Sequence, residues 1–291
     1  MNPLLIEIKQ DRPGFNGFIG SWVYQGARTI IVDVGPSNSV NHLIESLTAM
    51  NVDRIDFVLL THIHIDHAGG LAELLDHFPM ARVICHNKGI RHLVDPSRLW
   101  SGSLNALGEV AESYGPMKPV EPERLIPHTD ADLKDLKIIG TPGHAPHHLS
   151  FIYQGHFFVG EAGGNYFTIP GKDYLRPATP PVFLPTEFLM SVDTLLALED
   201  QPMYYGHFGS VESSRQFLQR SRDQLLRWRE IIEEEMSTEK SDLIERCVDR
   251  LLEKDQDLKT FALMEPDIQE RERFFLSNSV RGYVGFLKDN R

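Results

Sequence analysis

Short apolar runs bounded by Gly, Pro, Asn and Asp occur repeatedly in the first part of the chain, a pattern typical of β-strands. Between them lie segments whose apolar residues recur three and four positions apart, which predicts helices. The predicted strands are residues 4–9, 18–25, 28–35, 56–60 and 82–86, and the predicted helices are residues 39–52 and 71–78. The chain therefore mixes strands and helices from its beginning.

The segment from about residue 87 to 127 interrupts the strands, because residues 89–115 have helical spacing. This helical insertion is either a lid or wall over a site or a surface helical hairpin. Strands return at residues 136–140, 149–154 and 156–160. The proline-rich stretch 163–186 is predicted to be a long irregular loop, which is often functional. A helix at 191–200 and a strand at 202–206 follow.

From residue 211 onward the pattern predicts helices and no strands. Phe217, Leu218, Leu225 and Trp228 recur at helical spacing with charged residues between them. A second helix is predicted to begin at a cap, Ser241, and a third covers residues 271–287. We therefore divide the chain into a domain of residues 1–210 and a helical C-terminal extension of residues 211–291. The apolar stripes of the C-terminal helices need a surface to pack against. They would pack on the first domain, form a wall of the active site, or pair two subunits in a possible homodimer.

Composition narrows the function classes. The chain has 291 residues, enough for a substantial core, and a formal net charge of -12. An acidic surface repels phosphate groups, so we expect no nucleic-acid or membrane partner. The net charge does not exclude a local basic pocket. No apolar run is long enough to cross a bilayer, and we predict no signal peptide. Cys85 and Cys247 form no CxxC pair, so we expect a reduced, cytoplasmic protein.

Metal-binding side chains follow four of the predicted strands. The strand at 56–60 is followed by the dense string "THIHIDHAGG", and the other three strands end just before single candidates. If these strands lie side by side, their ends form one rim and the side chains converge there. The candidates are His62, His64, Asp66, His67, His144, Glu161 and His207. Isolated histidines (His42, His77, His92, His128 and His156) are interpreted as structural or surface residues.

Imidazoles and carboxylates suit borderline divalent metals, and soft thiolates are absent from this set. Seven candidates are too many for one four-coordinate ion, but they suit two ions that share a carboxylate. The sequence therefore predicts two divalent metal ions. Zinc is the first choice, with iron or manganese as alternatives.

Two motifs carry a resemblance to a known family. "THIHIDHAGG" resembles the THxHxDHxGG signature of the metallo-β-lactamase superfamily, and "TPGHAPHH" resembles the TPGH motif of its glyoxalase II branch. The resemblance covers about residues 1–210. It implies an α+β fold, namely a four-layer αββα sandwich of the metallo-β-lactamase type, with the metals at one edge of the sheets.

The resemblance also implies roles for single residues. His62, His64 and His144 would bind the first metal, and Asp66, His67 and His207 the second. Glu161 stands where the family usually has a bridging aspartate, so the bridge is longer, monodentate or lost. Asp66 would also act in catalysis by orienting the nucleophile. Asp33 and His148 match positions that support the ligands, and His147 is expected to be exposed.

The function implied is a metal-dependent hydrolase whose metal-bound hydroxide attacks a small-molecule thioester, lactone, other ester or phosphoester. Two alternatives stay open, an iron-dependent oxidoreductase and a non-enzymatic ligand-binding regulator that retains the fold. No substrate-binding residue is assigned. Arg98 and Arg176 either hold an anionic group of the substrate or form surface salt bridges. Tyr174 lies in the loop expected beside the site, and Trp100 of the helical insertion is either a pocket residue or packed in the core.

Overall fold

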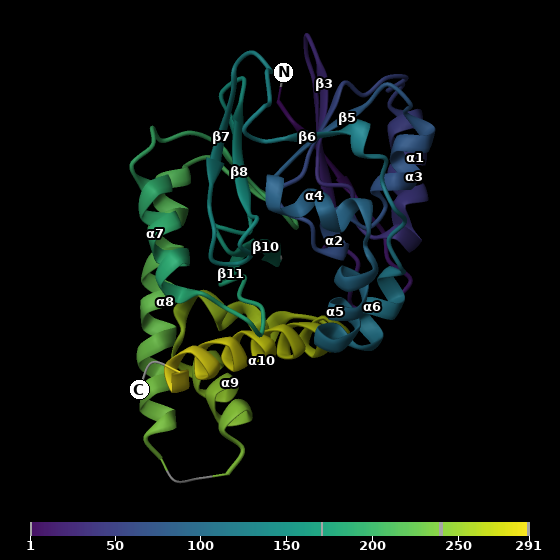
Figure 1. Cartoon of the computed structure of the whole chain (residues 1–291). Coiled ribbons are helices and arrows are strands. Elements are labelled where there is room, and N and C mark those ends of the chain that lie inside the picture. Colours follow the sequence, from purple (N-terminus) through teal and green to yellow (C-terminus); the bar gives the residue numbers. More distant parts are fainter. Residues whose placement is uncertain (1, 170, 239–240, 290–291) are drawn as a thin grey trace.

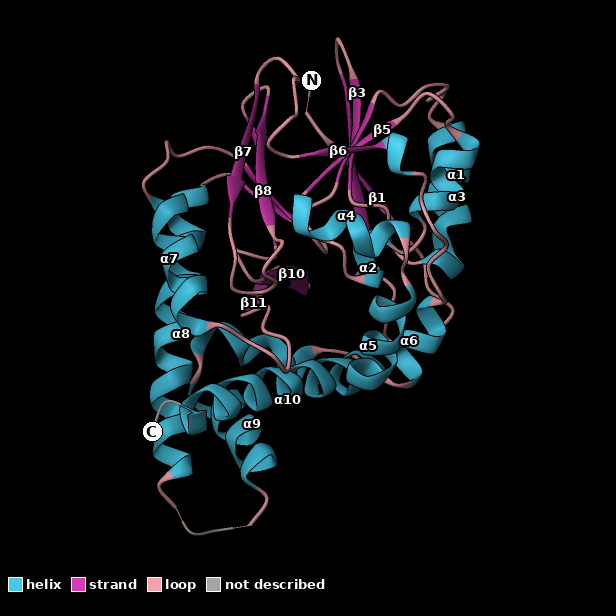
Figure 2. Ribbon diagram, in the orientation of Figure 1, coloured by secondary structure: helices cyan, strands magenta, loops and turns pink. Residues whose placement is uncertain are grey.

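The computed structural model describes residues 2–169, 171–238 and 241–289. Two β-sheets lie face to face in the middle of the molecule, and helices lie outside each of them (Figure 1). With the chain coloured by secondary structure, strands form the central layers and helices the outer ones (Figure 2). The α+β, four-layer αββα sandwich predicted from the sequence is therefore confirmed.

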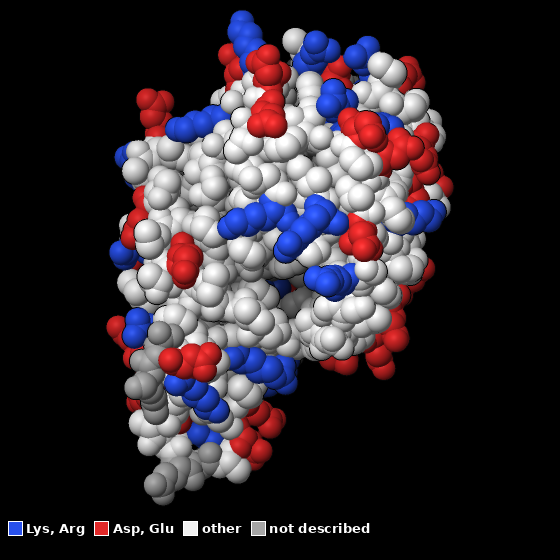
Figure 3. Space-filling model, viewed as in Figure 1, with Lys and Arg blue, Asp and Glu red and all other residues white. Residues whose placement is uncertain are grey.

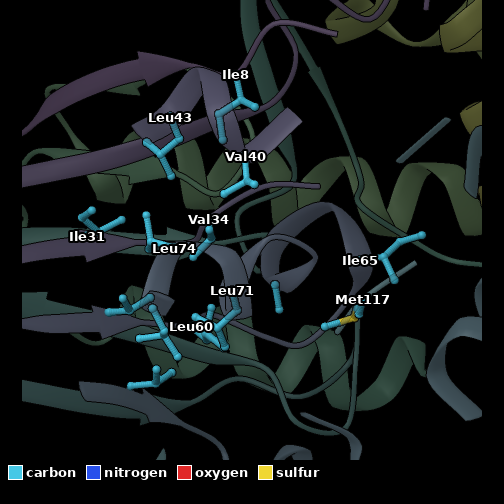
Figure 4. Packing of buried hydrophobic residues seen from close by; sticks show 14 of the residues in the cluster. Ile8, Ile31, Val34, Val40, Leu43, Leu60, Ile65, Leu71, Leu74 and Met117 are labelled. Carbon is cyan, nitrogen blue, oxygen red and sulfur yellow. The ribbon is translucent and has the colours of Figure 1, made fainter. Parts of the chain in front are cut away.

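The first sheet is formed by the N-terminal half of the chain, with strands in the order β1-β2-β3-β4-β5-β6. β1 to β3 pair antiparallel and β3 to β6 pair parallel. On its outer face, Leu43 and Leu74 of two covering helices pack with Leu60 and Ile8, all fully buried (Figure 4). The elements are β1 (Leu4–Glu7), β2 (Gly20–Gln25), β3 (Thr29–Val32), α1 (Val40–Ala49), β4 (Phe57–Leu59), α3 (Leu71–His77), β5 (Arg82–Cys85) and β6 (Leu125–Pro127).

The second sheet has the order β13-β12-β9-β8-β7, and its outer face carries α7 and α8 (Figure 1). Its inner face packs on the first sheet through a buried cluster that includes Trp22, Leu59, Phe151 and Phe158. This cluster holds the two sheets together and so fixes how their strand ends face each other. The elements are β7 (Leu136–Gly140), β8 (Leu149–Tyr153), β9 (His156–Gly160), α7 (Pro185–Leu196), β12 (Met203–Tyr205) and β13 (Ser210–Val211).

The predicted helical insertion contains α4 (Asn87–Val94), α5 (Ser97–Leu107) and α6 (Glu109–Tyr114). Its last residues, Leu125–Pro127, form the edge strand β6 of the first sheet. The sequence pattern missed this strand because three residues that end in proline are too short to show an alternation of apolar and polar positions.

The prediction of an irregular loop at 163–186 is wrong for its first half. Residues there form an antiparallel hairpin of β10 (Asn165–Ile169) and β11 (Lys172–Arg176), in which Asn165 pairs with Arg176. Tyr174 and Leu175 of this hairpin are fully buried. The many prolines that follow in the sequence masked the two short strands, since proline and glycine normally mark loops.

The C-terminal extension consists of α8 (Ser214–Met236), α9 (Leu243–Lys254) and α10 (Pro266–Asp289). Its apolar stripes pack on the second half of the sandwich, where Leu218 and Trp228 share one buried cluster with Phe157 and Phe188. α10 runs below β10 and β11 from α5 and α6 towards α8 and α9, whose ends extend further down (Figure 1). Within the described residues, no helix combines the length and apolarity needed to cross a membrane.

Two details at the start of the C-terminal extension differ from the sequence prediction. A short strand, β13, includes Val211, where only helices were expected. Ser241 does not cap α9, because the residue before the helix is Asp242 in a left-handed conformation with φ 59°. The Ser241 hydroxyl instead donates to the Asp242 carboxylate.

Candidate metal centre

The ends of four strands from both sheets meet at one edge of the sandwich. β4 is followed by His62 and His64, and α2 (Ile65–Ala68) begins directly after them. The remaining candidates lie in this helix or directly after β7, β9 and β12. The structure brings together all seven candidates, His62, His64, Asp66, His67, His144, Glu161 and His207.

The seven side chains form two groups, each of which could hold a metal ion. The first contains His62, His64, His144 and Glu161, and the second contains Asp66, His67 and His207. Within each group the candidate ligand atoms lie within 4.8 Å of one another. The division of the five histidines and Asp66 is the one implied by the family resemblance, which gave Glu161 a place between the two groups.

The Glu161 carboxylate lies between the two groups. Its Oε2 is 2.8 Å from His144 Nε2 and 3.3 Å from His62 Nε2, both in the first group. Its Oε1 is 3.2 Å from His207 Nε2 in the second group. The extra methylene of glutamate has therefore not moved the carboxylate away from the centre. Its Oε1 faces the second group, whereas Oε2 faces the first group and also lies 3.6 Å from His67 Nε2 of the second.

Asp33 orients one histidine of each group. It accepts hydrogen bonds from the Thr61 backbone N–H at 2.8 Å and from the Thr61 hydroxyl at 2.7 Å. Its Oδ2 is also 2.8 Å from His67 Nδ1, and the Thr61 hydroxyl is 3.0 Å from His62 Nδ1. These contacts occupy Nδ1 of the His62 and His67 rings, so that Nε2 of each ring is left to bind a metal ion.

Two buried nitrogen atoms test whether the site fits a metal. His62 Nε2 and His67 Nε2 are buried and have no hydrogen-bond partner among the described residues. Unpaired buried polar atoms are rare because each costs free energy. Both atoms lie beside the Glu161 carboxylate, and one cation in each group would satisfy the unpaired nitrogen of that group. The donor set of imidazoles and carboxylates fits zinc, iron or manganese.

His148 fixes the backbone that carries Glu161. Its Nε2 accepts a hydrogen bond from the Glu161 backbone N–H at 3.0 Å, and its Nδ1 is 2.7 Å from the Thr141 hydroxyl. Gly160 allows this approach, because a Cβ at this position would lie 2.5 Å from His148 Nε2, and its φ of +62° also favours glycine. The hydrogen bond between His148 and the Glu161 backbone therefore requires a glycine at position 160.

Burial and neighbouring charges set the protonation of the site. Burial lowers the pKa of His62 well below its usual value and that of His64 to about 4, so both rings are neutral and keep a free lone pair. Burial also acts to lower the pKa of His67, but the carboxylates of Asp33, Asp66 and Glu161 together outweigh it and raise the pKa well above its usual value. The pKa of Glu161 is held well below its usual value, against burial, by His144 and His207.

A pocket of about 440 Å³ opens over the two groups. Its floor includes Asp66 and Glu161, and α5, α10 and the loop after β11 supply apolar walls. Figure 3 shows a hollow on this face of the molecule with basic side chains gathered beside it. The helical insertion is therefore a wall of the pocket. Apolar wall residues include Leu99, Leu107, Pro180 and Phe275.

Residues outside the candidate set occupy varied places. Arg98 lies on the rim of the pocket, whereas Arg176 is buried in an ion pair with Glu272 and is not available to an incoming anion. His147 was expected to be exposed but is half-buried and lines the pocket, where burial and nearby imidazoles lower its pKa to about 2. His92, interpreted as a structural or surface residue, also lines the pocket.

Tyr174 is completely buried, and Trp100 packs against the first core cluster. Sequence reasoning missed two residues next to the centre. The Phe18 ring lies 4.5 Å from the His207 ring, and Asn165 lies beside Glu161. Neither belongs to a motif of metal-binding residues, so no local signal could have identified them.

Replacing Asp33 with asparagine is expected to weaken metal binding by about 10- to 100-fold, the usual effect of losing a partner that orients a ligand. In one orientation the amide presents its NH₂ group to both His67 Nδ1 and the Thr61 hydroxyl, and in the other to the Thr61 backbone N–H, so an acceptor is lost in either case. Titration of the metal-free protein with Zn²⁺ measures the effect. Asp56→Asn is the control, because Asp56 accepts from the Thr29 N–H far from the cluster. Equal affinities in both variants would contradict the role of Asp33.

An αββα sandwich with histidine and carboxylate side chains gathered at the ends of its strands defines a metallo-β-lactamase-type protein. The chain belongs to the metallo-beta-lactamase superfamily, because the model of this family matches residues 16–215. The resemblance to this superfamily inferred from the sequence motifs is thus confirmed. The relatives include hydroxyacylglutathione hydrolases, which are glyoxalase II enzymes.

Relatives of known sequence carry hydrolase or fold names. The chain is 29% identical over 192 residues to a metallo-beta-lactamase fold-containing protein of Sulfurisphaera tokodaii, covering 63% of this chain and 69% of the relative. It is 30% identical to a hydroxyacylglutathione hydrolase of Hydrogenovibrio crunogenus, covering 64% of this chain and 58% of that enzyme. An atrochrysone carboxyl ACP thioesterase of Aspergillus fumigatus is 26% identical, over 77% of this chain and 62% of the relative.

The solved structures extend the similarity beyond the sandwich. An archaeal metallo-beta-lactamase superfamily protein from Sulfolobus tokodaii has a TM-score of 0.70 at 23% identity, covering 97% of this chain and 98% of that chain. A metallo-beta-lactamase family protein from Thermus thermophilus has a TM-score of 0.65 at 20% identity, over 99% and 93% of the two chains. These similarities show the fold, and they include the region of the C-terminal helices.

Proposed function

We propose that the protein is a metal-dependent hydrolase that binds two divalent metal ions, zinc in the first place, and cleaves thioesters or related esters of apolar acids. The observation that carries the proposal is the convergence of seven ligand side chains, in two groups, on the floor of a largely apolar pocket. Two metals bound there would lower the pKa of a coordinated water and polarise the carbonyl oxygen of the substrate.

The chain's own residues would act around that chemistry. His62, His64 and His144 would hold the first metal, Asp66, His67 and His207 would hold the second, and the Glu161 carboxylate would be shared between the two groups. The Asp66 side chain keeps 17% of its surface exposed, more than Glu161 at 5%. It therefore faces the pocket and can orient the attacking water, while Asp33 and His148 hold the ligands in place.

The pocket supports a particular class of substrate. Its walls are mainly apolar and would exclude water from an acyl chain. Arg98 is exposed at the rim and has no ion pair within the described part of the chain, so it can hold an anionic group on the leaving side. The name of one relative, a thioesterase, agrees with this choice.

The test is a substrate panel on the full chain loaded with Zn²⁺. It includes coenzyme A thioesters, neutral N-acetylcysteamine thioesters, lactones and phosphodiesters. Hydrolysis of thioesters that disappears on metal removal and returns with Zn²⁺ supports the proposal. A protein that binds iron and is active only in redox assays would overturn it in favour of the oxidoreductase, and tight ligand binding without any turnover would favour the regulator.

Arg98→Glu is expected to raise KM for a coenzyme A thioester about tenfold, with little change for the neutral thioester. The change replaces a weak exposed attraction with a repulsion of similar size. Arg82→Glu alters the net charge equally, but Arg82 begins β5, and β5 supplies none of the candidate ligands. If both substrates respond alike to Arg98→Glu, the rim does not bind an anionic leaving group.

A further inference from the structure

A network of buried polar side chains links the C-terminal helix α10 to the Glu161 carboxylate. It begins at Glu272, which is completely buried, and passes through Arg176 and Asn165, which are 2% and 3% exposed. None of these three side chains belongs to the two metal-binding groups. Buried polar groups with a full set of partners specify one arrangement of their side chains. This network is therefore a feature of the site and not a chance surface contact.

The hairpin of β10 and β11 brings the two middle members of this network together, because Asn165 and Arg176 are directly paired across the hairpin. The orientation of the Asn165 amide that satisfies both neighbours places its nitrogen 3.1 Å from Glu161 Oε1 and its oxygen 3.1 Å from both Nη1 and Nη2 of Arg176. Asn165 therefore donates to Glu161 and accepts from Arg176.

At its far end, this network is an ion pair between Arg176 of β11 and Glu272 of α10. Arg176 Nε donates to Glu272 Oε2 at 2.7 Å, and Arg271 Nε donates to the other oxygen at 3.0 Å. The pKa of Glu272 is lowered, against burial, by these two guanidinium groups. Glu272 is thus a charged anchor that fixes the direction of the Arg176 guanidinium.

α10 touches the second metal-binding group in another way. The Arg271 guanidinium lies 4.1 Å from the centre of the Phe18 ring, and the Phe18 ring lies 4.5 Å from the His207 ring. Both routes from α10 lead to the same side of the centre, namely Glu161 Oε1 and His207.

We infer that Asn165, Arg176 and Glu272 are positioning residues that hold the Glu161 carboxylate between the two groups with its Oε1 towards the second, and thereby set the affinity for the second ion. The inference rests on the proposed dinuclear centre. Glutamate has one more rotatable bond than aspartate, so its carboxylate loses more freedom when it is fixed. A hydrogen bond to Oε1 fixes that oxygen in advance.

The neutral amide has a physical advantage at this position. An arginine in direct contact with Glu161 would place a third positive charge next to two cations and weaken their binding. Asn165 separates the Arg176 guanidinium from the Glu161 carboxylate, and the Glu272 carboxylate, shared with Arg271, offsets part of the guanidinium charge. The polarised amide still donates a strengthened hydrogen bond. This arrangement therefore orients the bridge without competing with the metals for it.

The experiment titrates metal-free full-length protein with Co²⁺ and Zn²⁺ and follows the visible Co²⁺ spectrum. Asn165→Leu keeps the size of the side chain and removes the donor, and Asn165→Ala provides a second variant without added bulk. We expect the second ion to bind about 10- to 100-fold more weakly in both, with the first ion little changed. Glu272→Gln should shift the same step in the same direction, although Glu272 touches no ligand.

Gln224→Leu is the matched control. Gln224 is a completely buried amide that donates to the Leu175 carbonyl of the same hairpin, but it has no contact with the cluster. It should reduce thermal stability without changing the affinity for the second ion. Unchanged second-ion affinity in Asn165→Leu and Asn165→Ala, with two ions in the wild type, overturns the positioning role alone. A wild-type chain that takes up a single ion overturns the dinuclear centre of the proposed function and this inference with it.

Discussion

Replacing Glu161 with glutamine is expected to release the second metal ion first and to lower any hydrolytic activity more than about 100-fold. Loss of a partner that only orients a ligand already costs about 10- to 100-fold, and Glu161 lies directly between the two groups. Glutamine keeps the shape of the side chain but removes its negative charge. Two cations held close together then repel each other without an anion between them.

Metal analysis of the purified variants measures this effect. Glu161→Asp is the informative companion, because it restores the residue type usual in the family and keeps the charge. We expect it to retain more of the second ion than Glu161→Gln, but less than the wild type, since the shorter side chain withdraws from the Asn165 amide that now contacts Oε1. The same stoichiometry in the glutamine variant and the wild type would show that Glu161 is not a bridge.

A chain that ends at Ser210 is expected to be insoluble or to lose its activity. It lacks the helices whose Leu218, Trp228 and Leu276 are completely buried against the second half of the sandwich. Burial of each such side chain contributes roughly 1.5–3 kcal/mol, so the loss of several exceeds the 5–15 kcal/mol by which a typical domain is stable. The deletion also removes the Phe275 wall of the pocket.

Solubility, size-exclusion chromatography and metal content of the shortened chain decide this prediction. A soluble, monodisperse and fully active product would show that residues 211–291 are dispensable. Chromatography of the full chain tests the possible homodimer at the same time. The structure removes one reason to expect it, because the apolar stripes of α8 are already covered within the chain. The division at residue 210 remains a prediction until the shortened chain has been made.

The main features of the candidate site could be predicted from the sequence because they are local. His62, His64, Asp66 and His67 lie within six residues, so the turn after β4 alone places them close together. The other three candidates each follow the end of a strand, and strand ends meet at the edge of a sheet. The predictions for His147 and for residues 163–186 failed because neighbouring prolines made these segments look like exposed loop.

The sequence by itself determined the seven candidate ligands and the acidic net charge, which follow from short patterns and from composition, and the resemblance of its two motifs to a known family implied the αββα class. Only the tertiary structure decided that the helical insertion and α10 form walls of the pocket, and that Arg176 is paired with Glu272, 96 residues away. Such contacts depend on how distant helices pack on the sheets, and no local pattern records that packing. The Glu161 side chain therefore appeared in the sequence as a departure from the family, whereas the fold shows the Asn165 amide that holds it.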